Sequence, residues 1–194
     1  TEAEFQDQMN QANEYLNKLL LNQKATTLYL ISMVEDKSSL VTSKQIKNLL
    51  NINLLIDHIR NTYDNIYVLI GEKRKQRIWY GPTQRSILLH RINDATVMLK
   101  RSIQLLQTGS FNKNNWKGLD LNLKEKKQDY LDYEKELILE LERGEMKMAS
   151  VITYYRMAQY LDSINEALRN ILTELSDEPL GIGNKQFTAP REEV

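Results

Sequence analysis

Two groups of oxygen-bearing side chains recur at helical spacing in this chain of 194 residues. The first stripe is Asp57, Asn61 and Asn65, and the second stripe is Asp162, Glu166 and Asn170. Because the members stand four residues apart, each stripe lies along one face of an α-helix, with neighbouring Cβ atoms about 5–6 Å apart. Carboxylate and amide oxygens are ligands for hard cations. Both stripes are therefore candidate metal sites.

A second interpretation of the stripes needs no metal. Asp162 and Glu166 are a like-charged pair, but the pair costs only a few tenths of a kcal/mol on an exposed helix, which is too little to require a cation. Arg60 follows Asp57 by three residues, and Arg169 follows Glu166 by three. These arginines can neutralise the carboxylates within one helix. We favour this solvated arrangement over bound divalent or iron-type metal, and keep both hypotheses.

Groups for covalent or acid–base catalysis are sparse in the sequence. The chain has no cysteine, which excludes thiol catalysis and Cys-ligated metal centres. Its only histidines are His58 and His90, and no serine forms a recognisable nucleophile motif with either. His90 and Asp94 are expected to form a surface hydrogen bond rather than half of a metal site. Since the sequence also lacks a Gly-rich phosphate loop and a dinucleotide fingerprint, we predict that the protein is not an enzyme and has no cofactor.

The segments that carry the two stripes have matching apolar seams. Both seams have spacings of 3, 4, 3, 4, 3 and 4 residues, and they superpose without a gap at an offset of 105 residues. The same offset superposes the two stripes, so the pattern is an internal repeat. Seams of period 3.5 pack at a shallow crossing angle, and we expect the two helices to meet around a pseudo-twofold axis. The seam residues are Leu49, Ile52, Ile56, Ile59, Tyr63, Ile66 and Ile70, and Tyr154, Met157, Leu161, Ile164, Leu168, Ile171 and Leu175.

Glycine and proline separate long periodic segments along the chain. The seven Gly and three Pro punctuate a pattern that predicts five helices, at about 2–32, 42–71, 83–109, 119–142 and 147–175. The expected buried face of the third helix comprises Ile87, Leu88, Ile92, Ala95, Leu99, Ile103 and Leu106. The predicted fold class is all-α, an elongated bundle of about five long antiparallel helices. We expect one domain over 1–178, with pseudo-symmetric units at about 1–80 and 83–178, and a flexible tail over 179–194.

A basic stretch with two aromatic residues joins the second and third predicted helices. It contains Lys73, Arg74, Lys75, Arg77, Trp79, Tyr80 and Arg85. One interpretation is contact with lipid headgroups. The other is that the first three cations complement the carbonyl end of the second helix while Trp79 closes the end of the bundle. We favour the second, because basic runs are most often solvated surfaces.

The repeated helix resembles a known family. The segment N-L-L-I-D-H-I-R-N-T-Y-D-N-I at 53–66 is similar to the PhoU pattern N-D-L-E-R-I-G-D-H-A-E-N-I, and 162–171 resembles its second copy. Each copy ends in Asn-Ile. Residues 40–50 are similar to the serine- and glutamine-bearing entry of that helix, and 141–145 resemble the R-L-x-x-G-E turn before the second copy. The most similar variant is the PhoU-like domain at the carboxyl end of bacterial sodium/phosphate cotransporters, over about 13–175.

This resemblance implies a pair of three-helix units with a regulatory role in phosphate transport. It implies a cytoplasmic, membrane-associated location, as the soluble part of an inner-membrane protein, and a partner in the membrane transporter portion or the phosphate-uptake machinery. Five helices instead of six imply that the first helix of the first unit is missing, shortened or upstream of Thr1. Homo-oligomers and peripheral membrane contact stay open. The rival hypotheses are a stand-alone helical scaffold and a degenerate metal-binding sensor.

The family's acidic motif can hold clustered transition-metal ions. Carried over by position, the candidate ligands are Asp57 and Asn61 in the first copy and Asp162 and Glu166 in the second. Asn61 replaces a carboxylate with a neutral amide, and the flanking glycine of the motif is replaced in both copies. The resemblance therefore implies a weakened or absent metal site.

The charge balance excludes some partners. The chain has 26 basic and 26 acidic residues, so no global field attracts nucleic acid, and a charged partner must be bound by a local patch. The apolar runs are only a few residues long, whereas a membrane span needs about 20. We therefore expect no transmembrane helix and no nucleic-acid partner.

Overall fold

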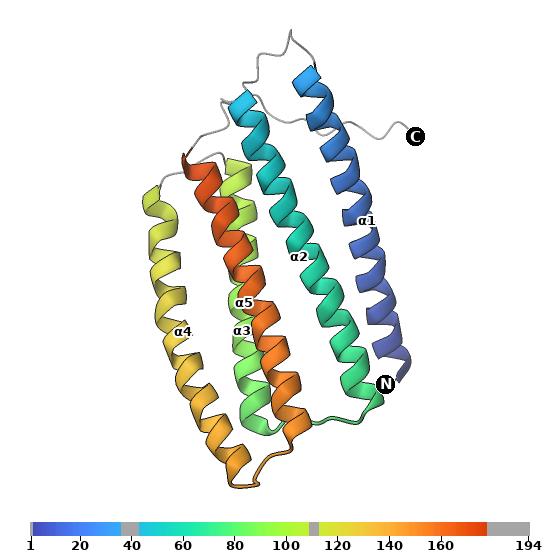
Figure 1. Ribbon diagram of the computed structural model, residues 1–194, viewed down its shortest axis with the longest axis vertical. Coiled ribbons are helices and arrows are strands. Elements are labelled where there is room, and N and C mark those ends of the chain that lie inside the picture. Colours follow the sequence, from blue (N-terminus) through green and yellow to red (C-terminus); the bar gives the residue numbers. More distant parts are fainter. Residues whose placement is uncertain (1, 36–42, 109–112, 178–194) are drawn as a thin grey trace.

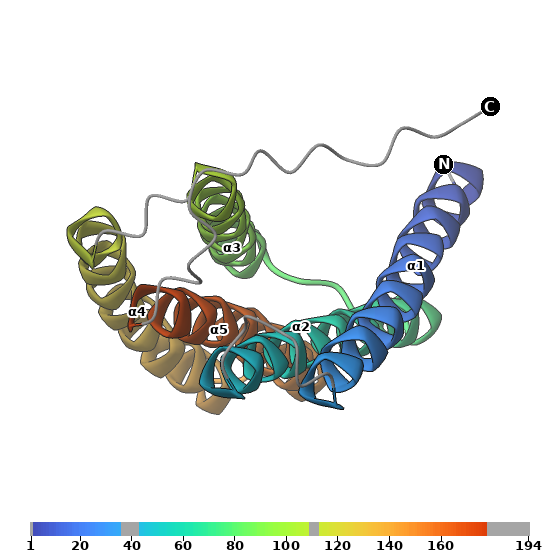
Figure 2. The ribbon, with the colours of Figure 1, turned by 90° about the horizontal axis from the view of Figure 1, so that it is seen from above.

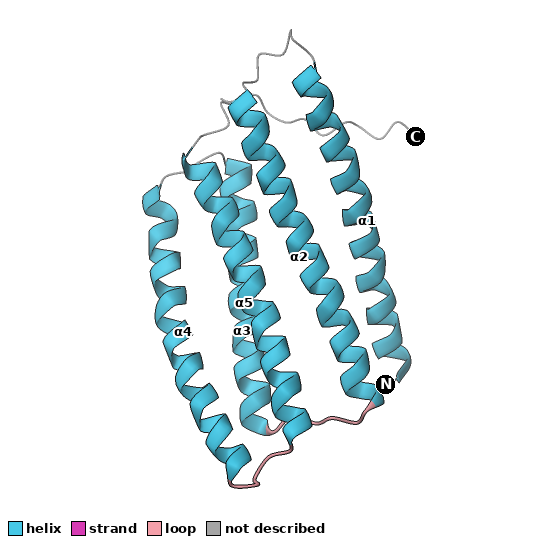
Figure 3. Ribbon diagram, viewed as in Figure 1, coloured by secondary structure: helices cyan, strands magenta, loops and turns pink. Residues whose placement is uncertain are grey.

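The protein is a bundle of long helices, as predicted (Figures 1 and 3). The computed structural model describes residues 2–35, 43–108 and 113–177, and all regular elements within these ranges are helical. The expected tail over 179–194 lies outside the described residues. The helices are α1 (Glu2–Glu35), α2 (Ser43–Lys75), α3 (Pro82–Thr108), α4 (Lys113–Glu142) and α5 (Met148–Asp177). None of the helices in these ranges has an apolar stretch long enough to cross a membrane.

Two of the predicted helix ends are wrong for the same reason. The sequence predicts that α2 ends near Gly71 and that α4 begins just after Gly118, but both glycines lie inside helices. A helical glycine costs only about 1 kcal/mol relative to alanine, and the rest of a long helix can offset that cost. As a result α2 continues to Lys75, and α4 begins at Lys113.

The predicted stop after α4 is confirmed. Gly144 has a φ of 74°, a left-handed conformation that glycine adopts without the steric penalty of a side chain. Its N–H donates to the Leu141 carbonyl at 3.0 Å, and the Glu145 N–H donates to the Glu140 carbonyl at 2.9 Å. These two bonds form a Schellman motif, which satisfies carbonyl groups at the helix end.

The helices differ in how many neighbours cover them. α2 and α5 lie side by side in opposite directions, with α1 on the far side of α2 (Figures 1 and 2). α3 and α4 both pack against α5 and touch each other, whereas α1 packs only against α2 in the described part of the chain. α5 is therefore covered by three helices and α2 by two.

This arrangement buries the two predicted seams unequally. Every seam residue of α5 is at least 93% buried. In the α2 seam Ile52 and Ile59 are buried, but Leu49, Ile56, Ile66 and Ile70 are half-buried, and Tyr63 is 38% exposed. The reason is that α3 covers the α5 seam, while no described helix covers the corresponding side of α2.

The buried face of α3 is rotated from the predicted one. Ile92 and Ile103, which we expected inside, are 45% and 44% exposed. Polar side chains of α3 such as Arg91 and Asp94 are buried instead, because α4 and α5 supply ion-pair partners for them. Leu106 of the predicted face lies outside the described side chains. Among those that are described, the buried residues of α3 are Gln84, Leu88, Arg91, Asp94, Ala95, Met98 and Ser102.

Candidate functional site

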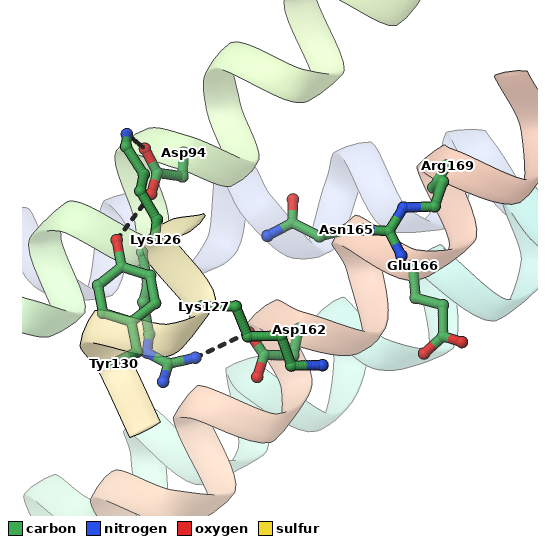
Figure 4. Close-up of a pocket in the computed structure, with 9 residues that line it drawn as sticks. Asp94, Lys126, Lys127, Tyr130, Asp162, Asn165, Glu166 and Arg169 are labelled. Atoms are coloured by element: carbon green, nitrogen blue, oxygen red, sulfur yellow. Dashed lines mark hydrogen bonds and ion pairs between the residues drawn. The ribbon is translucent and has the colours of Figure 1, made fainter. Parts of the chain in front are cut away.

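A polar pocket lies where α3, α4 and α5 meet, and it contains part of the second stripe (Figure 4). Four cationic and three anionic side chains line it, so its charge is nearly balanced. The lining residues are Arg91, Asp94, Lys126, Lys127, Tyr130, Asp162, Asn165, Glu166 and Arg169.

Arg91 of α3 is the centre of this pocket. Its side chain is 3% exposed, and burial of an unpaired guanidinium would be very costly. Its Nη1 donates to Asp162 Oδ1 of α5 at 2.7 Å, and its Nη2 donates to Glu134 Oε1 of α4 at 2.6 Å. The guanidinium also lies 4.2 Å from the centroid of the Tyr130 ring. One arginine therefore ties three helices together.

Asp94 forms a second ionic group on the same side of α3. Lys126 Nζ donates to Asp94 Oδ1 at 2.5 Å, and Tyr130 OH donates to Asp94 Oδ2 at 2.7 Å, as Figure 4 shows. The expected surface hydrogen bond between His90 and Asp94 is not formed, because Asp94 is buried and His90 is exposed. The correct partners come from α4, which no local spacing could indicate.

Burial where α3, α4 and α5 meet shifts the pKa values of two groups on α4. Burial raises the pKa of the Glu134 carboxyl, although the nearby Arg91 guanidinium acts in the opposite direction. Burial is also the main cause of the raised pKa of the Tyr130 hydroxyl, and its hydrogen bond to Asp94 adds to the effect. Both shifts show that desolvation dominates at this junction.

The second stripe does not converge on one point in the pocket. Asp162 is bound to Arg91, and the Glu166 carboxylate points away from that of Asp162 (Figure 4). No group of three or more His, Asp or Glu side chains in the described residues is arranged to hold a metal ion. Since four cations also line the pocket, its residues do not fit a divalent cation. Asn170 lies outside it, beside a second, shallow pocket between α2 and α5.

The first stripe is neutralised within α2. Arg60 Nε and Nη2 donate to Asp57 Oδ1, both at 3.2 Å, as we predicted from their spacing. Asn61 Nδ2 donates to Asp57 Oδ2 at 3.0 Å, and Arg60 also pairs with Asp64 at 2.8 Å. Both oxygens of Asp57 are thus engaged, and Asn65 is exposed farther along the helix.

The corresponding carboxylates are neutralised in different ways. Asp57 uses an arginine of its own helix, whereas Asp162 uses Arg91 of α3. The sequence gives no local signal for Arg91, since its partners stand 43 and 71 residues away. The one available signal was weak: Arg91 stands at the 3, 4, 3 spacing of Leu88, Ala95 and Met98, which are buried.

The pocket residues could support binding but not covalent catalysis. Most ionisable groups of the pocket are engaged in ion pairs between helices, and no nucleophile stands beside a base. Among the polar atoms of the lining residues, the buried donor Arg91 Nε and the buried acceptor Asn165 Oδ1 have no hydrogen-bond partner. The pocket could thus hold a small polar group, but it contains no constellation for covalent catalysis.

One polar contact joins α2 to α5 at corresponding positions. His58 Nε2 lies 2.7 Å from Ser163 Oγ, and the two residues are 105 positions apart. This separation equals the offset between the two seams.

Comparisons with protein families, with curated proteins and with solved structures gave no match. The resemblance to PhoU therefore rests on the residues of this chain alone.

Proposed function

We propose that this chain is a non-catalytic, PhoU-like regulatory or interaction domain that acts in sodium-dependent phosphate transport. The observation that carries the proposal is the contact between His58 and Ser163. When a twofold axis relates two antiparallel helices, residues near the axis lie beside their own equivalents. His58 and Ser163 are separated by the 105-residue offset of the repeat. Their contact is therefore expected if the two halves are duplicated units related by such an axis.

The helix bounds support the same duplication. α2 begins at Ser43 and α5 at Met148, which is again a separation of 105 residues. Each of these helices follows another long helix, so the hairpin α1–α2 corresponds to the hairpin α4–α5. α3 then leads the second unit, and the described part of the first unit has no counterpart to it. This order of long helices supports the proposal, because the family resemblance implies two related helical units.

The pocket chemistry favours regulation over catalysis. The ionic groups around Arg91 and Asp94 join three helices rather than presenting a nucleophile and a base. Metal is not part of the proposal, because Asp57 and Asp162 are each engaged by an arginine. We propose that the chain acts at the cytoplasmic side, by packing against the transporter or the phosphate-uptake machinery.

Sodium-dependent uptake of radiolabelled phosphate tests the function. Cells that lack the gene are complemented with the intact chain or with Leu161→Asp, which places a charge at a position 4% exposed in the core and should unfold the bundle. We expect the intact chain to restore the regulated uptake rate and the variant to fail. If deletion of the gene leaves uptake unchanged at low and high phosphate, the phosphate role is wrong and a helical scaffold is the better description.

A further inference from the structure

We propose that the end of the bundle at the α2–α3 connection binds the surface of an anionic lipid bilayer. Trp79 in this connection is 80% exposed, more than any other large hydrophobic residue that the structure describes. The expectation that Trp79 closes the bundle is therefore wrong. The neighbouring Tyr80 does so instead, because it is half-buried and packs on the core around Tyr154.

The backbone around Trp79 is held firmly. Arg77 has a φ of 52° and ends α2 in a Schellman motif, with its N–H donating to the Arg74 carbonyl at 3.0 Å. Ser150 Oγ, at the start of α5, lies 3.0 Å from the Trp79 carbonyl oxygen and 2.8 Å from Gln84 Oε1, and its single proton can be donated to either acceptor. Both Ser150 and Gln84 are buried. These contacts hold the backbone that carries the exposed indole.

The connection between α4 and α5 lies at the same end of the molecule (Figure 1). A Cβ atom on Gly81 would lie 3.4 Å from Met146 Cε, so the two connections adjoin. Together, residues 72–85 and 143–148 contain seven basic and two acidic side chains. Since the whole chain has no net charge, these two connections carry a positive excess that the rest of the molecule balances. Part of that balance, Glu2 and Glu4 in the first turn of α1, lies at the same end (Figure 1).

Several of these cations are free to meet a charged surface. Arg74 pairs with Glu2, and Arg143 pairs with Glu145. Five others have no ion-pair partner among the described residues. The five are Lys73, Lys75, Arg77, Arg85 and Lys147.

An exposed tryptophan beside several basic side chains fits the surface of a bilayer better than a groove on another protein. Tryptophan partitions to the headgroup level of membranes, where its ring is buried and its N–H stays hydrated. Lysine and arginine near an anionic leaflet strengthen binding by roughly fivefold each. Lys73 lies 4.6 Å from the Tyr80 ring centroid and 5.8 Å from that of Trp79, so charge and aromatic surface are combined in one place. Met148, also exposed, adds apolar surface.

The test uses the purified full chain and phosphatidylcholine vesicles with or without phosphatidylglycerol. A Trp116→Phe background leaves Trp79 as the sole tryptophan. We expect co-sedimentation with the anionic vesicles only, a blue shift of the Trp79 emission on binding, and loss of both signals at high salt. Equal binding to neutral vesicles, or binding without a change in Trp79 emission, would overturn the proposal.

Matched variants locate the surface. Lys75→Gln/Arg77→Asn removes two charges at this end, and asparagine tolerates the left-handed backbone at position 77. Lys18→Gln/Lys24→Gln removes two exposed charges from α1 as the control. We expect the first pair to weaken vesicle binding roughly 25-fold and the control to leave it within about twofold, with thermal unfolding confirming that both are folded. Equal losses would show that the surface is misassigned. This inference does not rest on the phosphate role, because the vesicle assay contains no transporter.

Discussion

α2 and α5 carry the same apolar pattern but have different surroundings. Ile56 of α2 is half-buried, whereas its counterpart Leu161 of α5 is 4% exposed. Tyr63 is 38% exposed, whereas its counterpart Leu168 is 3% exposed. The difference arises because α3 covers one helix and not the other. The comparison teaches that the apolar periodicity of a helix specifies which residues can be buried. The number of neighbouring helices then determines how deeply each of them is buried.

The polar residues beside the seams repeat this lesson. Asp57 and Asp162 are similarly exposed, at 42% and 44%, but their arginines differ. Asp57 pairs with Arg60 of its own helix, which is 13% exposed, whereas Asp162 pairs with Arg91 of α3, which is 3% exposed. The helices α3, α4 and α5, which we call the covered half, therefore contain both the more deeply buried apolar seam and the buried charge of Arg91. The hairpin α1–α2, the open half, contains ion pairs whose groups solvent already reaches.

The two arginines provide the sharpest test of this comparison. We expect Arg91→Ala to lower the free energy of unfolding by about 3 kcal/mol, because it leaves Glu134 and Asp162 without their buried partner. Arg60→Ala should cost less than about 1 kcal/mol, since its carboxylate partners are over two-fifths exposed. Urea unfolding measures both. Arg91→Lys keeps the charge but not the forked geometry, and it should lie between them. Equal losses for the two alanine variants would contradict the comparison.

Truncation of the two seams is expected to have the next largest effect. Leu161→Ala should destabilise the protein by about 2–4 kcal/mol, because its site is enclosed by α3, α4 and α5. Ile56→Ala should cost about 1 kcal/mol, since solvent already reaches its side chain. Chemical denaturation with unchanged m-values would make the comparison valid. If Ile56→Ala were the more costly variant, α2 would have cover that the described helices do not provide.

Alkaline pH should weaken the covered half. Burial raises the pKa of the Tyr133 hydroxyl to about 12 from 10.0. Because the folded pKa is higher than the unfolded one, the stabilising contribution is complete below pH 10 and is lost as the pH rises through about 12. Tyr133→Phe should therefore reduce the loss of stability across this window.

At neutral pH the Tyr133→Phe substitution should cost little, because the Tyr133 hydroxyl is buried without a hydrogen-bond partner. Unfolding free energies measured from pH 9 upward, with the exposed Tyr29→Phe as control, test the prediction. An alkaline profile that Tyr133→Phe leaves unchanged would show that this hydroxyl is not responsible.

The contact between the halves should give the smallest effect. A double-mutant cycle of His58→Ala and Ser163→Ala is expected to yield a coupling of about 0.5–1 kcal/mol, the usual net value of one hydrogen bond. The contact is solvent-exposed, so either single variant should remain folded. Zero coupling would mean that the two side chains do not interact in solution, and it would weaken the case for an axis at this point.

The sequence predicted the helices and the α5 seam because both depend on local periodicity. It also predicted the Gly144 stop, where one residue type has a conformational advantage. It could not predict the face of α3, because the burial of Arg91 depends on carboxylates 43 and 71 residues away. The ends at Gly71 and Gly118 were misjudged because tertiary packing can offset the low helix propensity of glycine.

α1 touches only α2 in the described part of the chain, and this has a consequence for how the molecule opens. Detaching α1 breaks one interface, whereas detaching α5 breaks three. The amide hydrogens of α1 should therefore exchange with solvent through a partial unfolding event of lower free energy than the global one. The chain is in this sense a four-helix unit with one separable member.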